Sequence, residues 1–174
     1  MTVYIALLRG INVGASKRIK MDDLRRVFQD LGFAEVQTFI QSGNVIFATV
    51  TPQSELTGLI EKALLQKFGF AVNVVIRSAA ELALIVSDCP FSADKTDSAH
   101  VALLTGDSTL SNLDRLEKSK SGSEEIHLAS HEIYLYLPHG FHDSKLAKGV
   151  QKAAPDATFR NWKTITSLLQ IIRQ

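Results

Sequence analysis

The chain has 174 residues and a mass of 19.1 kDa, which is enough for one ordinary domain or two small ones with a buried core. Apolar residues make up 45% and charged residues 21% of it, a globular composition that excludes a disordered chain. The net charge of +1 argues against a strongly basic nucleic-acid-binding protein, and the single cysteine, Cys89, excludes an intramolecular disulfide and a cysteine-rich zinc site.

The first half of the chain predicts elements in the order β-α-β-β-α-β. Short apolar runs predict strands and helical periodicity predicts helices, with the strands at 3–8, 34–40, 45–49 and 72–77 and the helices at 21–31 and 55–68. The polar turn Gln41-Ser42-Gly43-Asn44 indicates a hairpin between the middle strands. We expect Ser54 to cap the second helix, and Gly32 and Gly69 to follow the last turns of the two helices.

The second half predicts the same order again, after a short helix at 78–87 and a polar loop at 92–98. We expect strands at 100–105, 124–129, 132–137 and 157–159, and helices at 108–118, 143–153 and 161–173. Asp107 or Ser108 is the expected cap of the helix at 108–118.

This repeated order predicts an α+β fold of two tandem ferredoxin-like (βαββαβ) units with an extra C-terminal helix. The predicted units are residues 1–78 and 79–174. We see no clear residue-level repeat between the two halves, so the proposed duplication rests on the pattern of elements alone.

The loop after the first strand is the most informative segment. It begins Arg9-Gly10-Ile11-Asn12-Val13-Gly14, and six basic residues but only two acidic ones lie between Arg9 and Arg26. Glycines let backbone N–H groups approach an oxyanion, and a helix begins just beyond. The loop lacks the spacing of a P-loop and of a dinucleotide-binding fingerprint. It indicates an anion site; the alternative is a glycine turn with solvated lysines.

Four other segments carry polar candidates. The amides of Gln41 and Asn44 are suited to reading a base edge or a sugar, or they belong to an ordinary hairpin turn. Arg77-Ser78, Ser144-Lys145 and Arg160-Asn161-Trp162 each stand where a helix begins. A cation beside a helix N-terminus can bind an anion, although each of these segments is also a normal helix cap.

The usual catalytic sets are only weakly indicated in the sequence. His139 and His142 have no evident third metal ligand, so we predict no metal site. Cys89 precedes a proline and is expected to be packed. Asp22 and Asp23 suit the start of a helix better than a magnesium site. No residue pattern identifies a cofactor.

The L-R-G-I-N-V-G and Q-S-G-N motifs together resemble the DUF1697 family of uncharacterised bacterial proteins. Further matching pieces run to the last helix, so the resemblance covers nearly the whole chain: Lys20-Met21 with Leu24, Arg77-Ser78, Pro90-Phe91, Ser144-Lys145-Leu146 and Thr158-Phe159-Arg160-Asn161-Trp162 with Thr164. The resemblance implies no activity, but it selects the same polar residues. Ala15-Ser16 departs from it, because the family often has a further glycine there.

We therefore predict a binding protein for a small anionic ligand, phosphorylated or nucleotide-like, in a cleft between the two units. The expected ligand-binding residues are Arg9, Asn12, Lys20, Gln41, Ser42, Asn44, Arg77, Lys145, Arg160 and Asn161. An RNA-binding module, a phosphoryl- or nucleotidyl-transfer enzyme and a purely structural protein stay as alternatives. RNA is not favoured, because Tyr4 and Phe47 are the only aromatic candidates on the first and third strands.

We expect no membrane-spanning part, because no apolar run approaches the roughly 18–20 residues that cross a bilayer. The first ten residues also lack the basic segment and the cleavage site of a signal peptide. The expected location is therefore the cytoplasm.

Overall fold

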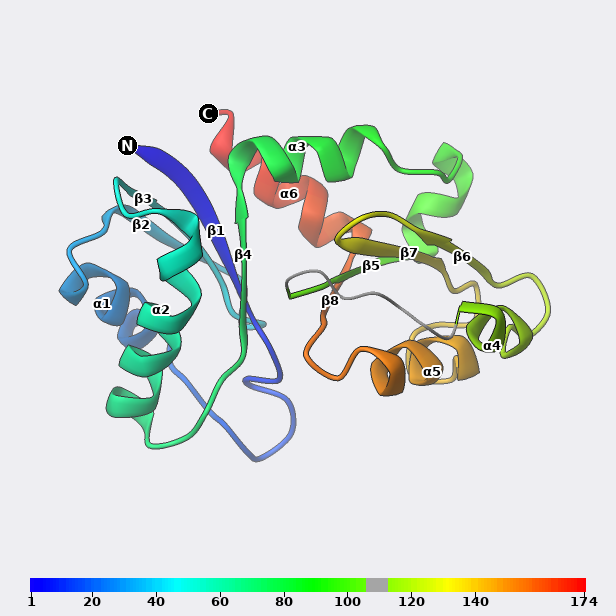
Figure 1. The fold of residues 1–174 in the computed structure, drawn as a ribbon, viewed down its shortest axis with the longest axis horizontal. Coiled ribbons are helices and arrows are strands. Elements are labelled where there is room, and N and C mark those ends of the chain that lie inside the picture. Colours follow the sequence, from blue (N-terminus) through cyan, green and yellow to red (C-terminus); the bar gives the residue numbers. More distant parts are fainter. Residues whose placement is uncertain (106–112) are drawn as a thin grey trace. The chain divides into compact units, whose positions relative to one another are not determined.

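A computed structural model of the chain describes residues 1–105 and 113–174. The fold is α+β, with two four-stranded antiparallel sheets and helices between the strands (Figure 1). The chain divides into two compact units. The first contains Met1–Leu84 and Leu168–Gln174, and the second contains Ile85–Ser167.

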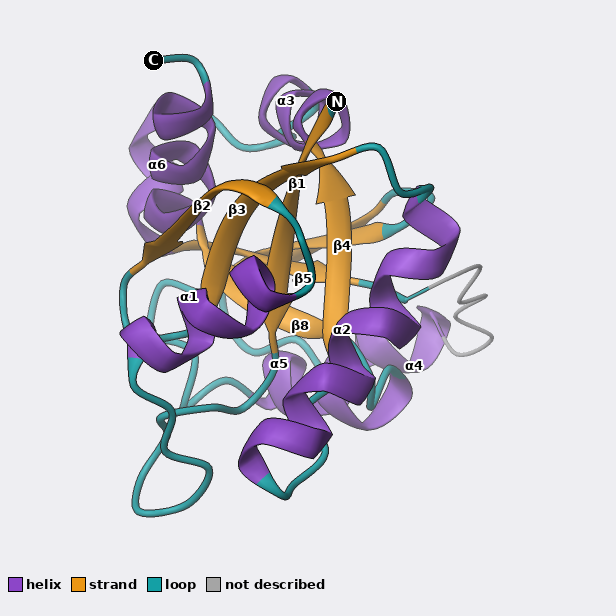
Figure 2. Ribbon diagram, turned by 90° about the vertical axis from the view of Figure 1, so that its left-hand side faces the viewer, coloured by secondary structure: helices purple, strands orange, loops and turns teal. Residues whose placement is uncertain are grey.

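The first unit holds a sheet with the strand order β2-β3-β1-β4. Its elements are β1 (Thr2–Leu8), α1 (Met21–Asp30), β2 (Ala34–Phe39), β3 (Asn44–Thr49), α2 (Gln53–Phe68) and β4 (Val74–Ser78). Both α1 and α2 lie against the same face of this sheet (Figure 2). The order of the elements along the chain is the predicted one.

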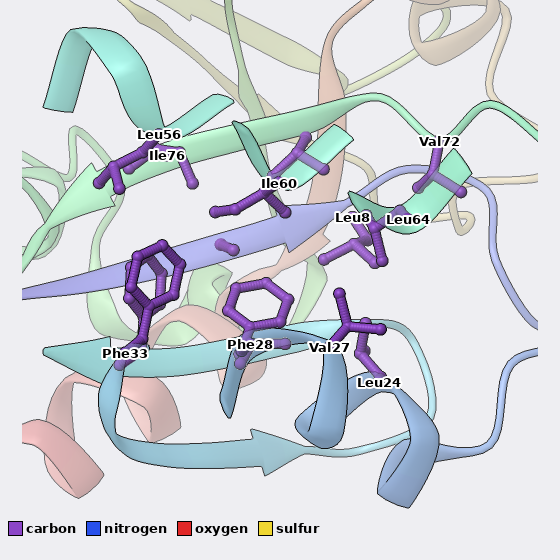
Figure 3. Close-up of a cluster of buried hydrophobic side chains, with 14 of the residues drawn as sticks. Leu8, Leu24, Val27, Phe28, Phe33, Leu56, Ile60, Leu64, Val72 and Ile76 are labelled. Carbon is purple, nitrogen blue, oxygen red and sulfur yellow. The ribbon is translucent and has the colours of Figure 1, made fainter. Parts of the chain in front are cut away.

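The core of the first unit lies between that face and the two helices (Figure 3). Alternate β1 residues, Tyr4, Ala6 and Leu8, point into it, because successive strand residues face opposite sides of a sheet. Phe33 stacks on Phe47 with ring centroids 4.6 Å apart. The intervening β1 residues are also fully buried. A strand buried on both faces explains the uninterrupted apolar run in the sequence.

The second unit holds a sheet with the strand order β6-β7-β5-β8. Its strands and its two covering helices are β5 (Ala99–Leu103), α4 (Leu113–Lys118), β6 (Glu125–Leu128), β7 (Glu132–Tyr136), α5 (Lys145–Ala153) and β8 (Thr158–Asn161). A 3₁₀ helix, η1 (Ala93–Ser98), precedes β5. The division between the units falls inside α3 (Ala79–Ser87) and α6 (Trp162–Ile172).

Several local predictions are confirmed and others are wrong. Gly32 and Gly69 follow α1 and α2 with φ angles of 79° and 77°, as expected for residues that end helices. Ser54 does not cap α2, because Pro52 takes the cap position and places Ser54 in the first turn.

Two further differences concern the second half. The expected loop at 92–98 contains η1, where the Lys95 N–H donates to the Ser92 carbonyl. Residues 108–112 of the helix expected at 108–118, and its expected caps, Asp107 and Ser108, lie outside the described residues.

The strand pairings align the first strand of one sheet with the first strand of the other. Tyr4 lies opposite Ser78 in the first sheet, and His100 lies opposite Asn161 in the second. The first strands therefore align as Tyr4-Ile5-Ala6-Leu7-Leu8 and His100-Val101-Ala102-Leu103-Leu104. Three of the five aligned residues are identical.

None of the described helices is both long enough and apolar enough to cross a membrane.

Candidate functional site

Hydrogen bonds hold the loop that follows β1 on two sides. On one side, two hydrogen bonds join the loop to the segment before β4. The Arg9 N–H, at the start of the loop, donates to the Asn73 carbonyl at 2.9 Å, and the Lys17 ammonium, further along the loop, donates to the Ala71 carbonyl at 2.9 Å. On the other side, the Leu8 N–H donates to the Gly43 carbonyl at 2.8 Å in the turn between β2 and β3. These contacts place the loop between the β2–β3 turn and the segment that leads into β4.

The Asn12 side chain joins the loop to the turn. Its Nδ2 donates to the carbonyls of Ile19 and Gln41, both at 2.9 Å, and its Oδ1 accepts from the Ile19 N–H at 2.8 Å. Asn12 itself has a φ of 56°, a left-handed conformation that asparagine tolerates better than most residues. The Asn12 amide thus binds the backbone of Ile19 and Gln41. We therefore describe Asn12 as a positioning residue for the loop.

Asn44 is the buried counterpart of Asn12 on the turn. Its side chain has no exposed surface, and its Nδ2 donates to the Phe39 carbonyl at 3.0 Å and to Ser42 Oγ at 3.1 Å. Between these partners, Ile40 has a φ of 49°, which is strained for a β-branched residue. The Asn44 amide therefore stabilises a turn that the Ile40 backbone would otherwise disfavour.

Gly43 lets the turn approach the loop. It has a φ of 83°, and a Cβ placed on it would lie 2.6 Å from Ile11 Cδ1 and 2.9 Å from Leu8 Cβ. Such distances are closer than side-chain atoms tolerate. Gly43 is needed both for its conformation and for the space that it leaves to Ile11.

Arg9 carries the feature most typical of a ligand site. Its Nη1 is buried, and it has no hydrogen-bond partner among the described residues. A guanidinium group is always charged in proteins, so an unpaired buried donor of this group is costly unless something else accepts from it. An anionic ligand or a bound water would satisfy it.

The charges around the loop favour an anion near Arg9 but not at the start of α1. Lys17, Arg18, Lys20 and Gln41 are exposed on the loop and the turn. The first turn of α1 already carries Asp22 and Asp23, which pair with Arg25 at 3.1 Å and Arg26 at 3.9 Å. These carboxylates occupy the positive end of the helix, so the helix N-terminus gives an external anion little help.

Arg77 belongs to the same unit but lies elsewhere in the sheet. It is opposite Ile5, whereas Val74 is opposite Leu8, so three residues or about 10 Å of β4 separate it from the level of the loop. Arg77 is buried, and its Nη1 donates to the Ile76 carbonyl at 2.9 Å.

Ser78, next to Arg77, caps α3 in a reciprocal arrangement with Glu81. Its Oγ accepts from the Glu81 N–H at 3.2 Å, and the Glu81 carboxylate accepts from the Ser78 N–H at 2.6 Å. Burial alone would raise the pKa of Glu81, but hydrogen bonds from Ser78 and Gln53 bring it below its usual value. This segment is a helix cap.

The remaining candidates lie in the second unit. Lys145 is exposed at the first position of α5, a helix that Ser144 caps through its Oγ. Arg160 is 8% exposed, and burial lowers its pKa to about 10, so it stays cationic at neutral pH. Asn161 accepts from the Thr164 N–H at 2.8 Å and thereby caps α6.

The structure therefore brings together part of the predicted set of ligand-binding residues. Asn12 donates to the Gln41 carbonyl of the turn, and Asn44 donates to Ser42 within the same turn. Arg9 and Lys20 lie on the loop that Asn12 joins to this turn. That the residues of the second unit serve the same cleft stays a prediction.

Sequence reasoning missed the residues that act through their backbone or their apolar bulk. Ile11 is buried against Gly43, and Ile19 supplies two of the three backbone partners of the Asn12 side chain. Apolar residues in an otherwise polar loop are the one signal that could have indicated these contacts.

The described part of the chain shows no evident metal ligands, and the aromatic candidates of the first sheet are buried. No group of three or more histidine, cysteine, aspartate or glutamate side chains there lies close enough together to hold a metal ion. Tyr4 and Phe47 are buried in the core under α1 and α2.

Comparison with known proteins agrees with the motifs. The family model "Protein of unknown function (DUF1697)" matches residues 1–134, and the chain belongs to this family. Among solved structures it is similar to the conserved bacterial protein SP0830 from Streptococcus pneumoniae, with a TM-score of 0.81 and 22% identity over 97% of each chain. At that identity the likeness shows the fold alone. No curated protein matches the chain.

Proposed function

We propose that this DUF1697 protein binds a small anionic ligand, phosphorylated or nucleotide-like, at the loop after β1, and that Arg9 holds the anionic group. The buried Arg9 Nη1 without a partner among the described residues carries this proposal. A phosphate or carboxylate oxygen accepts well from a guanidinium nitrogen. Binding would thus relieve a desolvation cost that the free protein pays.

The surrounding residues support this role because they keep the loop in place. Asn12 and Asn44 spend their amides on backbone partners, so we assign them to positioning. Lys20 and Gln41 are exposed beside them and are free to meet the rest of the ligand. A preformed framework of this kind reduces the entropy that ligand binding must cost.

The fold supports the same proposal at a coarser level. We infer that each unit is ferredoxin-like, because each has the order β-α-β-β-α-β and the corresponding strand order. This architecture hosts many activities, so the assignment rests on the loop and not on the fold.

No observation favours the other functions equally. Base stacking on the first sheet would need exposed aromatic side chains, and Tyr4 and Phe47 are buried. Metal-dependent phosphoryl transfer would need free carboxylates, and Asp22 and Asp23 pair with neighbouring arginines.

Isothermal titration with AMP, ribose 5-phosphate and inorganic phosphate tests the proposal, with adenosine as the uncharged control. We expect Arg9→Ala to weaken binding of a phosphorylated probe about 10- to 100-fold, because hydrogen bonds to charged groups contribute about 1.5–3 kcal/mol. Arg9→Lys keeps the charge but loses the planar fork, so it should recover only part of the affinity. Arg25→Ala removes an exposed charge on α1 and should change little.

Melting temperatures and binding by variants of the second unit complete this test. Each variant needs a melting temperature, because Asn44→Ala should destabilise the turn whereas Arg9→Ala should leave the fold intact. The proposal is wrong if folded Arg9→Ala binds every probe as the wild type does, or if no probe binds the wild type. Lys145→Ala and Arg160→Ala, measured in the same way, test whether the second unit contributes.

A further inference from the structure

A second site is indicated by a cavity between α4 and α5. Its volume is about 370 Å³, within the range of small-molecule pockets. The described residues that line it are Arg115, Leu116, Ser119, Gly149, Lys152 and Ala153. The two helices lie side by side in the second unit (Figure 1). The residues that line it belong to the second unit, whereas the loop that holds Arg9 belongs to the first.

Gly149 shapes the floor of the cavity. A Cβ placed on it would lie 3.1 Å from Leu116 Cδ2 and 3.3 Å from Ser119 Oγ. A glycine inside a helix costs about 1 kcal/mol relative to alanine, so its presence in α5 indicates that the helices need this close approach. With Leu116 and Ala153 beside it, the floor is apolar.

The rim of the cavity is cationic. Arg115 and Lys152 are exposed there, and none of the six lining residues that the structure describes is acidic. Ser119 donates its hydroxyl proton to the Leu116 carbonyl at 2.7 Å, so an anion would depend on the two cations. The acidic neighbour Glu117 pairs with Lys120.

The charge extends along α5. Lys145, Lys148 and Lys152 recur at i, i+3 and i+7, which places them on one face of the helix, and all three are exposed. The sequence of α5, KLAKGVQKA, contains no acid. In a chain whose net charge is only +1, this face concentrates positive charge beside an apolar hollow.

We propose that the cavity between α4 and α5 binds a free organic anion with a small apolar body. The apolar body would lie on Leu116, Gly149 and Ala153. The anionic group would lie between Arg115 and Lys152. This combination of an apolar floor and a cationic rim is complementary to an aryl or acyl phosphate or carboxylate, and it distinguishes such a ligand from inorganic phosphate.

Protein NMR with phenyl phosphate tests the proposal, with benzyl alcohol as the uncharged analogue and inorganic phosphate as the anion without an apolar body. We expect phenyl phosphate to shift the amide signals of Gly149 and Ser119 in a saturable way, and each control probe to bind at least tenfold more weakly. The same titration of Arg9→Ala should give unchanged shifts at Gly149, because Arg9 is not among the described residues that line the cavity.

Three variants locate the binding. The double variant Arg115→Gln with Lys152→Gln should weaken phenyl phosphate at least tenfold, whereas Lys62→Gln with Lys67→Gln removes the same charge from exposed positions of α2 and should have no effect. Ala153→Leu fills the cavity from an exposed position and should also abolish the Gly149 shift.

Three outcomes would overturn the proposal. One is equal binding of benzyl alcohol and phenyl phosphate, which would show an apolar hollow without anion selectivity. Another is an unchanged Gly149 shift in folded Ala153→Leu. The third is co-sedimentation with phosphatidylserine vesicles without any response to phenyl phosphate, which would make the lysine face of α5 a membrane contact.

Discussion

The two units form the same backbone contact at the end of their first strand and surround it with different side chains. In the first unit the Leu8 N–H donates to the Gly43 carbonyl, and in the second the Leu104 N–H donates to the His131 carbonyl. Gly43 is buried against Ile11, whereas His131 is exposed. The strand register thus aligns two turns of different chemistry.

In the same alignment of the two units, Asn44 corresponds to Glu132 and Arg9 corresponds to Thr105. The second sheet therefore closes its corresponding contact without a buried asparagine and without an arginine at the end of its first strand. The two units thus differ in the side chains that stand at these two aligned positions.

Arg77 and Arg160 illustrate the opposite case. They lie opposite Ile5 and Val101, at aligned positions of the two sheets, and each donates an Nη1 hydrogen bond to the carbonyl of the residue before it. Each is followed by a helix cap, Ser78 or Asn161. Because both units repeat this arrangement, we infer that it belongs to the scaffold, although the sequence analysis counted three of these residues as ligand-binding.

The largest expected difference between the units is the response to substitution in the aligned turns. Gly43→Ala should cost about 2–4 kcal/mol of unfolding free energy, because it combines a left-handed backbone with overpacking against Ile11 and Leu8. His131→Ala, at the aligned exposed position, should stay within about 0.5 kcal/mol. Urea unfolding of both variants measures this. Equal losses of unfolding free energy in the two variants would mean that the turns at Gly43 and His131 are packed alike, which would contradict the difference described above.

The sequence predicted the scaffold better than the site, for physical reasons. Alternation, periodicity and helix-ending glycines such as Gly32 and Gly69 are local signals, and they located most strands and helices. The partners of Asn12 lie 7 and 29 residues away along the chain, at Ile19 and Gln41. Both contacts use backbone carbonyls, which carry no residue identity. No local pattern could therefore show which polar side chains are engaged.

Arg9 also shows what a sequence can and cannot predict about a site. Its position after the first strand was visible in the sequence, and so was its membership of a motif. The burial of Nη1 arises only in the folded chain, where the surroundings of the side chain are set by tertiary packing. The sequence could thus select the residue but not the property that makes it a candidate for ligand binding.

A smaller effect tests whether the repeated caps are equivalent. Ser78→Ala and Asn161→Ala each remove the side-chain acceptor at the start of a helix, α3 or α6. Each should cost about 1 kcal/mol, the usual value for a lost N-cap. Denaturant unfolding of the two variants gives the comparison. A loss confined to one of them would show that only that cap stabilises the fold and would weaken the repeated-scaffold interpretation.

The smallest expected effect concerns His100, which aligns with Tyr4 of the first unit and packs against Phe141 with ring centroids 5.4 Å apart. Burial lowers the pKa of His100 below its ordinary value of 6.5, while a hydrogen bond to the Ser98 carbonyl opposes this shift. The folded protein therefore disfavours the protonated form. The associated stability is fully present above about pH 6.5 and is lost as the pH falls through the folded pKa.

Replacing His100 by Phe removes this titration. Between pH 7.5 and pH 5.5, we expect its unfolding free energy to fall by less than that of the wild type. Tyr4→Phe keeps His100 and should lose stability over the same range as the wild type does. Urea unfolding at both pH values measures the difference, and carboxylates that titrate in this range contribute equally to all three proteins. A steeper pH dependence in His100→Phe would mean that the charged imidazole stabilises the second unit, opposite to what its burial implies.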